Sequence, residues 1–197
     1  MEFGKTPLFE KVNYKLAPDQ IGFDISDKNE ANFLIGTPTW NQKEWIDLIY
    51  PKGLKSNQYL SYYSKYFHSI ELNSTHYAIP TSERIIEWRN MTPDGFRFCP
   101  KVPQKVSHGG LLNEIDVWNY FVKNMLLFED RLGLTFLQLS DRFTYSNFFT
   151  LSAFIQTIPK DFQLGVELRH ESFYRNQALI PEVVDLFYKH NISAVIT

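Results

Sequence analysis

Charged and amide side chains recur at regular positions in short apolar segments of this chain. In the stretch 69–77, Glu71 and Asn73 alternate with Ile70 and Leu72, so in a strand the acid and the amide share the face opposite the apolar pair. A plain core strand would not carry such a pair. The same alternation in three later segments selects a face that carries Arg97 and Lys101, then Gln138, then Glu167 and Arg169, with His170 directly after.

Together these side chains could perform acid/base chemistry on a small, nucleotide-like or other anionic ligand. Glu71 or Glu167 would act as a general base, and Lys101 as an electrophile or as the partner of a carboxylate or phosphate. Arg169 suits anion binding in a fork geometry. We therefore expect Glu71, Lys101 and Glu167 to be catalytic, and we expect the ligand to be bound by Asn73, Tyr77, Arg97, Gln138, Arg169, His170 and Trp40.

Other interpretations of these residues stay open. Inward acids and bases can neutralise one another as a structural network, although apolar replacements of buried ion pairs are often equally stable. Lys101 becomes an amine nucleophile, able to form a Schiff base, if burial lowers its pKa. The aromatic side chains in the loops either form a rim that stacks on a ligand above the pocket or pack the loops against the fold. They are Trp40, Trp45, Tyr77 and Phe173.

A divalent metal is a further alternative for the same region. No pair of histidines has the H-E-x-x-H spacing, and lone loop histidines are more often surface hydrogen-bonding groups. We therefore assign no metal ligand and no cofactor, and leave zinc or manganese as an alternative. Its ligands would come from Glu71, His76, His108, Glu167 and His170.

The elements that must position these residues alternate along the chain. Apolar strand segments begin near residues 33, 69, 96, 134, 164 and 192, at intervals typical of a βα unit. Strict alternation of strand and helix predicts a parallel sheet. The helices are expected over 59–67, from Thr81 or Ser82 to about residue 91, over 118–128 with Gly133 as the left-handed residue that follows, over 148–158, and from Pro181 onward.

A TIM-type (β/α)8 barrel explains this pattern better than a doubly wound sheet. The turn Gly36-Thr37-Pro38-Thr39 lacks the G-x-G-x-x-G sequence of a dinucleotide-binding fold. In a barrel, the loops after the strands build the active site, which would bring the selected side chains together. This α/β chain has only about six strands of such a barrel.

The sequence predicts two regions. Residues 1–32 are mixed in composition and are expected to be an N-terminal extension, and residues 33–197 are expected to form the partial barrel. Six strands would leave two parallel edges unpaired. We favour a fragment of a longer protein over a barrel that a partner closes, and a truncated barrel that does nothing alone is a third interpretation.

Composition narrows the function classes. The net charge is −2 and the charges are spread along the chain, which lowers the expectation of non-specific nucleic-acid binding. A nucleic-acid or nucleotide binder, or a metal-dependent phosphodiesterase of the barrel endonuclease type, stays as the alternative to an enzyme such as a hydrolase or lyase. The single Cys99, with neither a signal segment nor a membrane span, predicts a cytoplasmic protein, and the sequence does not indicate its oligomeric state.

Several motifs follow one another along the chain. They are Ile35-Gly36-Thr37 with Trp40 and Trp45, Tyr50-Pro51-Lys52-Gly53-Leu54, Glu71-Leu72-Asn73-Ser74-Thr75 with Tyr77, Thr92-Pro93 with Gly95-Phe96-Arg97-Phe98, then Lys101, Pro103 and His108, Phe136-Leu137-Gln138-Leu139, and Val166-Glu167-Leu168-Arg169-His170. In this order they resemble the YecE-like family, a group of uncharacterised proteins with a TIM-type barrel. The resemblance implies a barrel with two further units and supplies no reaction. The chain departs from the family pattern at Pro38-Thr39, His76 and Ser140, which concerns loop shape more than the charged residues.

Overall fold

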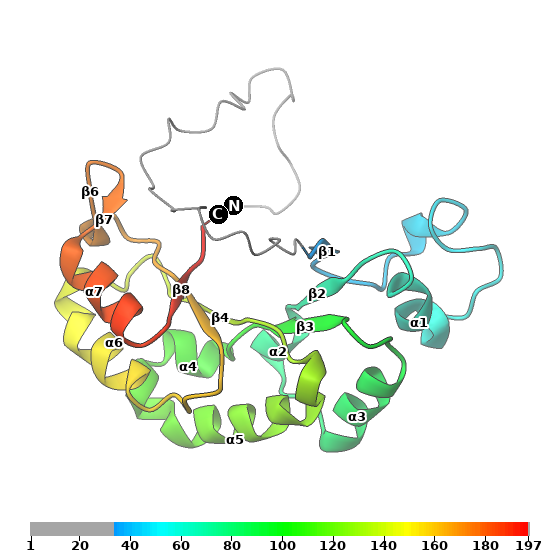
Figure 1. Cartoon of the computed structure of the whole chain (residues 1–197), viewed down its shortest axis with the longest axis horizontal. Coiled ribbons are helices and arrows are strands. Elements are labelled where there is room, and N and C mark those ends of the chain that lie inside the picture. Colours follow the sequence, from blue (N-terminus) through cyan, green and yellow to red (C-terminus); the bar gives the residue numbers. More distant parts are fainter. Residues whose placement is uncertain (1–33, 197) are drawn as a thin grey trace, which may run out of the picture. The chain divides into compact units, whose positions relative to one another are not determined.

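The computed structural model describes residues 34–196. The expected N-terminal extension, residues 1–32, lies outside the described residues, as does the expected first residue of the first strand. The described residues form short parallel strands separated by helical segments, with one antiparallel hairpin near the end (Figure 1).

Parallel strands follow one another in chain order in two sheets, β1-β2-β3 and β4-β5-β8. Backbone bridges from Phe98 to Leu132 and from Lys101 to Phe136 continue the parallel pairing from the first sheet to the second. Over residues 34–196 these strands do not close into a barrel, so the structure shows a mixed α/β fold with parallel sheets. The strands are β1 Gly36–Thr37, β2 Ser69–Leu72, β3 Arg97–Pro100, β4 Thr135–Gln138, β5 Leu164–Glu167 and β8 Ser193–Ala194.

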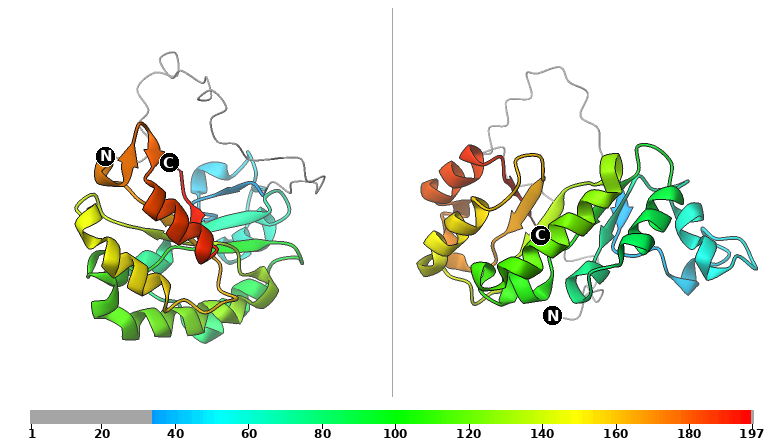
Figure 2. Two further views of the ribbon diagram at one scale, coloured as in Figure 1. Left: turned by 60° about the vertical axis from the view of Figure 1, so that its left-hand side comes forward. Right: turned by 90° about the horizontal axis from the view of Figure 1, so that it is seen from below.

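The longer helices cover one side of these strands, as Figures 1 and 2 show for α3, α5, α6 and α7. The side chain of Thr81 caps α3 by accepting a hydrogen bond from the amide of Arg84, and Pro181 opens α7, as the sequence predicts. The helices are α1 Tyr59–Tyr63, α2 Ser74–Tyr77, α3 Ser82–Asn90, α4 Gln104–His108, α5 Ile115–Met125, α6 Phe148–Ile155 and α7 Pro181–Lys189.

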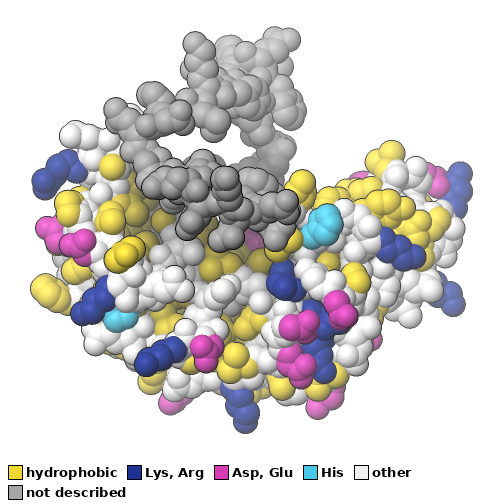
Figure 3. All heavy atoms as spheres, in the orientation of Figure 1, with side chains coloured by type: hydrophobic (Ala, Val, Ile, Leu, Met, Phe, Trp, Pro, Cys, Tyr) yellow, Lys and Arg dark blue, Asp and Glu magenta, His cyan; other side chains and the backbone are white. Residues whose placement is uncertain are grey.

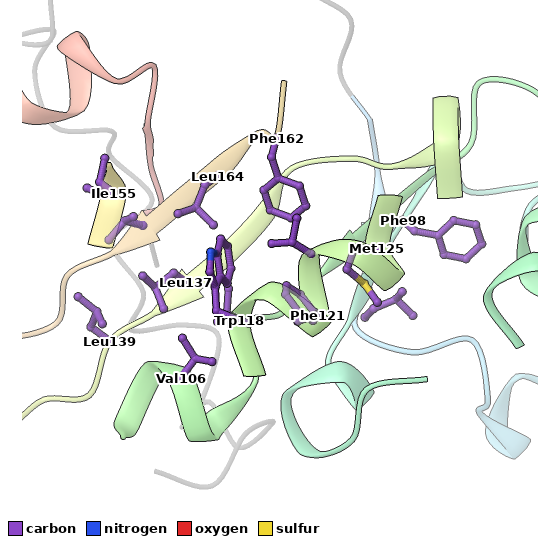
Figure 4. Packing of buried hydrophobic residues seen from close by; sticks show 14 of the residues in the cluster. Phe98, Val106, Trp118, Phe121, Met125, Leu137, Leu139, Ile155, Phe162 and Leu164 are labelled. Carbon is purple, nitrogen blue, oxygen red and sulfur yellow. The ribbon is translucent and has the colours of Figure 1, made fainter. Parts of the chain in front are cut away.

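The core lies between the strands and this helical layer. Trp118 of α5 is fully buried and packs its ring against Phe154 and Phe162, at centroid distances of 4.9 and 5.7 Å. Leu137 of β4 and Leu164 of β5 meet the same cluster from the sheet (Figure 4). Burying one such side chain stabilises the fold by roughly 1.5–3 kcal/mol, so this packing fixes which face of each strand points toward the helices.

The opposite face of the strands carries the polar side chains. On β2 and β3, Leu72 and Phe98 are buried, whereas Glu71 and Cys99 between them are only half-buried, and Gln138 alternates with Leu137 in the same way. This alternation agrees with the period-two pattern of the sequence.

Gly133 differs from its expected role. It does not have a positive φ, and the preceding 3-10 helical segment, Leu126–Arg131, ends with Leu132 as its C-cap in an extended conformation. The amide of Gly133 donates to the carbonyl of Phe98 at 2.7 Å, and a Cβ on Gly133 would lie 2.8 Å from Cys99 Sγ. The glycine is needed because the chain passes close beside β3 there, a reason that local sequence cannot reveal.

Three short elements were not predicted. They are α2, α4 and the antiparallel hairpin of β6 Tyr174–Arg175 and β7 Ala178–Leu179. Each is too short to produce a recognisable hydrophobic period. None of the helices within residues 34–196 has both the length and the apolar character needed to cross a bilayer.

Candidate functional site

The carboxyl ends of β2, β3, β4 and β5 bring four of the predicted residues to one edge. Gln138 and Glu167 are the last residues of β4 and β5 and pair with each other. Glu71 is the third of the four residues of β2, and Lys101 directly follows β3. Parallel strands present their carboxyl ends at a common edge, which is why residues nearly a hundred positions apart in sequence meet here.

Glu167 is a buried carboxylate, with 3% of its surface exposed. Gln138 Nε2 donates to its Oε2 at 2.7 Å, and Arg169 Nε lies 3.2 Å from its Oε1. The Arg169 side chain is 40% exposed, so one end of this pair is buried and the other reaches the surface. The carboxylate is therefore held in one orientation next to a cation that a ligand can reach.

Lys101 is the second buried charge of the site, with 8% of its surface exposed. Its Nζ lies 5.4 Å from the centroid of the Phe136 ring. In the part of the chain that the structure describes, no carboxylate forms an ion pair with this ammonium group. Burial lowers the pKa of Lys101; the charges of Glu71 and Glu167 oppose that shift, and Arg169 adds to it.

Thr75 fixes the backbone of Lys101. This threonine is fully buried in α2, and its Oγ1 accepts a hydrogen bond from the amide of Lys101 at 3.0 Å. The same hydroxyl lies 2.7 Å from the carbonyl oxygens of Leu72 and Lys101, to which it donates its proton. The sequence analysis gave Thr75 no role; the available signal was a hydroxyl side chain directly after a strand, where it can bond the backbone.

Two histidines lie close to Lys101. His76 Nδ1 is 2.8 Å from the carbonyl oxygen of Val102, which can only accept, so Nδ1 carries a proton and Nε2 of the neutral ring is an acceptor. The rings of His76 and His108 are 5.7 Å apart. Burial lowers the pKa of both histidines, and the charge of Lys101 adds to this shift.

The sequence left open a zinc or manganese site whose ligands would come from these two histidines, His170, Glu71 and Glu167. Among residues 34–196, no group of three or more His, Cys, Asp or Glu side chains is close enough to hold one metal ion. His170 instead accepts through Nδ1 from the amide of Ser172 at 3.1 Å, and Ser172 Oγ lies 2.8 Å from the same nitrogen.

The other predicted ligand-binding residues occupy different places. Asn73 is half-buried at the start of α2, and Tyr77 at its end is 80% exposed, with its ring 5.2 Å from that of His76. Arg97 shares a face with Lys101 but opens β3, at the opposite end of the strand, and it donates to the carbonyl of Phe96. Trp40 packs edge-on against Trp88 of α3, at a centroid distance of 5.3 Å. This contact is the one expected if Trp40 packs its loop against the fold.

Tyr174 is a neighbour of the site that the sequence did not indicate. Its hydroxyl donates to the carbonyl of Leu168 at 2.6 Å. Burial raises its pKa, and the charge of Glu167 raises it further. Tyr174 reaches this place through the unpredicted hairpin of β6 and β7, so no pattern in the sequence could have selected it.

Positive charge is not concentrated on one visible face of the described residues (Figure 3). On the face seen in Figure 3, Lys and Arg side chains are interspersed with Asp and Glu side chains. That face therefore offers no continuous basic area of the kind that binds nucleic-acid backbones.

Comparisons with known proteins identify relatives without a known activity. A family model described as "Protein of unknown function DUF72" matches residues 34–197. The chain is 36% identical over 141 residues to UPF0759 protein YecE of Escherichia coli (strain K12), which covers 71% of this chain and 49% of that protein. The chain thus spans about half the length of the curated relatives it matches.

Two solved structures share the fold. A DUF72 family protein from Enterococcus faecalis V583 superposes with a TM-score of 0.69 at 23% identity, over 83% of this chain and 60% of that chain. A DUF72 family protein from Thermotoga maritima MSB8 gives a TM-score of 0.67 at 27% identity, over 83% of this chain and 64% of that chain.

Proposed function

This chain belongs to the DUF72 family of proteins of unknown function, and we propose that it performs acid/base chemistry on a small anionic molecule at the carboxyl ends of β2 to β5. The observation that carries the proposal is the burial of Lys101 and Glu167 at one strand edge. Removing a charge from water costs several kcal/mol per ion, and within residues 34–196 Lys101 has no ion pair that would offset this cost, so its burial is an expensive way to stabilise a sheet.

The proposed roles follow from the contacts. Glu167, oriented by Gln138 and Arg169, is the general base or acid. Arg169 and Lys101 bind the anionic group, Arg169 through the exposed part of its guanidinium group and Lys101 through its ammonium group. Glu71 acts on the ligand from β2 or tunes the charge of Lys101.

The proposed site corresponds to a more specific fold than parallel sheets covered by helices. We propose that the parallel strands are part of a TIM-type barrel whose active site lies at the carboxyl ends of the strands. The consecutive strand order and the helical layer on one side support this, and so does the greater length of the relatives. A cytoplasmic location is a further part of the proposal, and cell fractionation would test it.

Ligand binding tests the proposed function. The 197-residue chain would be screened by calorimetry against small carboxylates and phosphate esters, in the wild type and in the variants Lys101→Met and Arg169→Gln. We expect a bound anion whose affinity falls on the order of tenfold or more in both variants, because each loses a charge-assisted contact worth more than 1.4 kcal/mol.

The matched control is Lys123→Met, which removes an exposed lysine from α5 and should leave the affinity unchanged. Equal binding by the wild type and both site variants would refute the proposed function.

A further inference from the structure

The surroundings of Lys101 differ from those of a lysine that only forms an ion pair. A lysine that only neutralises a carboxylate is expected to contact it, yet within residues 34–196 the Lys101 ammonium group has no ion pair and lies over the ring of Phe136 instead. With 8% of its surface exposed, this side chain is one of the few charged groups buried in the described structure. Such a buried amine is easier to deprotonate, and only the neutral amine is a nucleophile.

The charged groups around Lys101 come from every neighbouring element. Glu71 on β2 and Glu167 on β5 favour the ammonium form. Arg169 after β5 disfavours it, and the two histidines His76 of α2 and His108 of α4 are themselves affected by its charge. Burial outweighs the two carboxylates, so the pKa of Lys101 lies below that of an exposed lysine.

The backbone that carries this amine is held rigidly. Thr75 bonds both the amide and the carbonyl of Lys101, and the amide of Val102 donates to the carbonyl of Phe136 at 2.9 Å. A nucleophile whose backbone is already fixed loses less conformational entropy when it takes up the geometry of attack on a bound ligand.

From these observations we infer that Lys101 Nζ forms an imine with the carbonyl carbon of a small oxo acid whose carboxylate is bound by Arg169. This inference rests on the proposed function, since it uses the same anion site, and it adds the substrate class and the covalent step. Arg169 alone holds the carboxylate in the covalent step, and Lys101 acts there as the neutral amine instead of as a second anion-binding group.

The step balances without an oxidant or reductant. The lone pair of the neutral Lys101 amine forms the C–N bond, and the π electrons of the carbonyl move to its oxygen. The nitrogen then loses one proton and the oxygen takes one up, which gives a neutral carbinolamine. Glu167 is a nearby group that can exchange these protons. A second proton lets the oxygen leave as water when the C–O bond breaks, and an iminium ion between Lys101 and the former carbonyl carbon is left.

Reductive trapping tests the inference. The 197-residue chain would be incubated with glyoxylate and sodium cyanoborohydride, which converts an iminium ion into a stable secondary amine, and the modified lysine would be located by peptide mass mapping. We expect Lys101 to be modified faster than the exposed Lys123, because burial lowers its pKa and a lysine with a lower pKa has a larger neutral fraction. The variant Lys101→Arg should lose this fast modification, whereas the variant Lys105→Arg, altered at an exposed lysine of α4, should keep it.

Modification spread evenly over exposed lysines, with Lys101 no faster, would overturn the inference. This measurement on the wild type does not depend on whether the Lys101 variant folds. The proposed function is tested separately with acetate, which has the carboxylate but no reactive carbonyl. Acetate binding that requires Arg169, without trapping at Lys101, would leave the anion site standing and refute only the imine, whereas loss of both would refute both.

Discussion

The hydroxyl of Thr75 is hydrogen-bonded to both backbone polar groups of Lys101, at 3.0 Å from the amide nitrogen and 2.7 Å from the carbonyl oxygen. It also contacts the carbonyl of Leu72, the last residue of β2, at 2.7 Å. One buried side chain therefore joins the carboxyl end of β2 to the residue that follows β3. The position of the Lys101 amine depends on a group 26 residues earlier in the chain.

Replacing this hydroxyl should destabilise the fold. In Thr75→Val the shape is kept, but the buried amide of Lys101 loses its side-chain acceptor and keeps only the carbonyl of Leu72 at 3.3 Å, which costs about 0.5–1.5 kcal/mol. Urea denaturation would measure the free energy of unfolding. Thr75→Ser, which keeps the hydroxyl, should recover most of the loss, and the exposed Ser74→Ala serves as control. A Thr75→Val variant as stable as the wild type would show that the contact is not needed.

Removing the negative charge of Glu167 should lower the pKa of Lys101 further. The charge of Glu167 favours the ammonium form, so in Glu167→Gln the neutral amine forms at lower pH. The titration of Lys101 can be followed by NMR after reductive ¹³C-methylation of the lysines. The exposed Glu182→Gln on α7 should leave the Lys101 titration where it was. An upward shift in Glu167→Gln would contradict the charge arrangement described here.

Protonation of His76 should weaken the fold as the pH falls. Burial lowers the pKa of folded His76 below 6.5, its value in an unfolded chain, so the unfolded state binds more protons below that pH. The stabilisation that comes from the neutral His76 ring is fully present above about pH 6.5. It is lost as the pH falls below this value toward the lower pKa of His76 in the folded state.

The comparison that isolates this effect is His76→Asn, whose amide can donate to the carbonyl of Val102 in place of Nδ1 without titrating. Denaturation at a series of pH values should show a shallower loss of stability in this variant than in the wild type. Parallel pH profiles would mean that His76 is not the titrating group.

Gly133→Ala should destabilise the junction between β3 and β4. The new Cβ would lie 2.8 Å from Cys99 Sγ and 3.1 Å from the carbonyl oxygen of Phe98, and such overpacking typically costs about 1–3 kcal/mol. Thermal melting measures the effect.

The double variant Gly133→Ala with Cys99→Ala tests the cause. Removing the sulfur should restore part of the loss relative to Cys99→Ala alone, while the contact with the Phe98 carbonyl remains. Additive losses in the two variants would show that the sulfur is not the obstacle.

The sequence by itself determined the order of the parallel strands and of the longer helices, and the polar face of β2 to β5. Alternation over two residues is a local property, so it correctly placed Glu71, Gln138 and Glu167 opposite the buried Leu72, Leu137 and Val166. Because successive parallel strands end at the same edge, the sequence also indicated that the residues near their carboxyl ends would meet.

Only the tertiary structure decided how these residues contact one another. The same alternation selected Arg97, but the bounds of β3 place it at the opposite end of the strand from Lys101. The bonds from Gln138 to Glu167 and from Thr75 to Lys101, and the packing of Trp40 on Trp88, join residues 26 to 48 positions apart. Such contacts depend on strand register, on a one-turn helix and on the path of a loop, and no local period in the sequence encodes these.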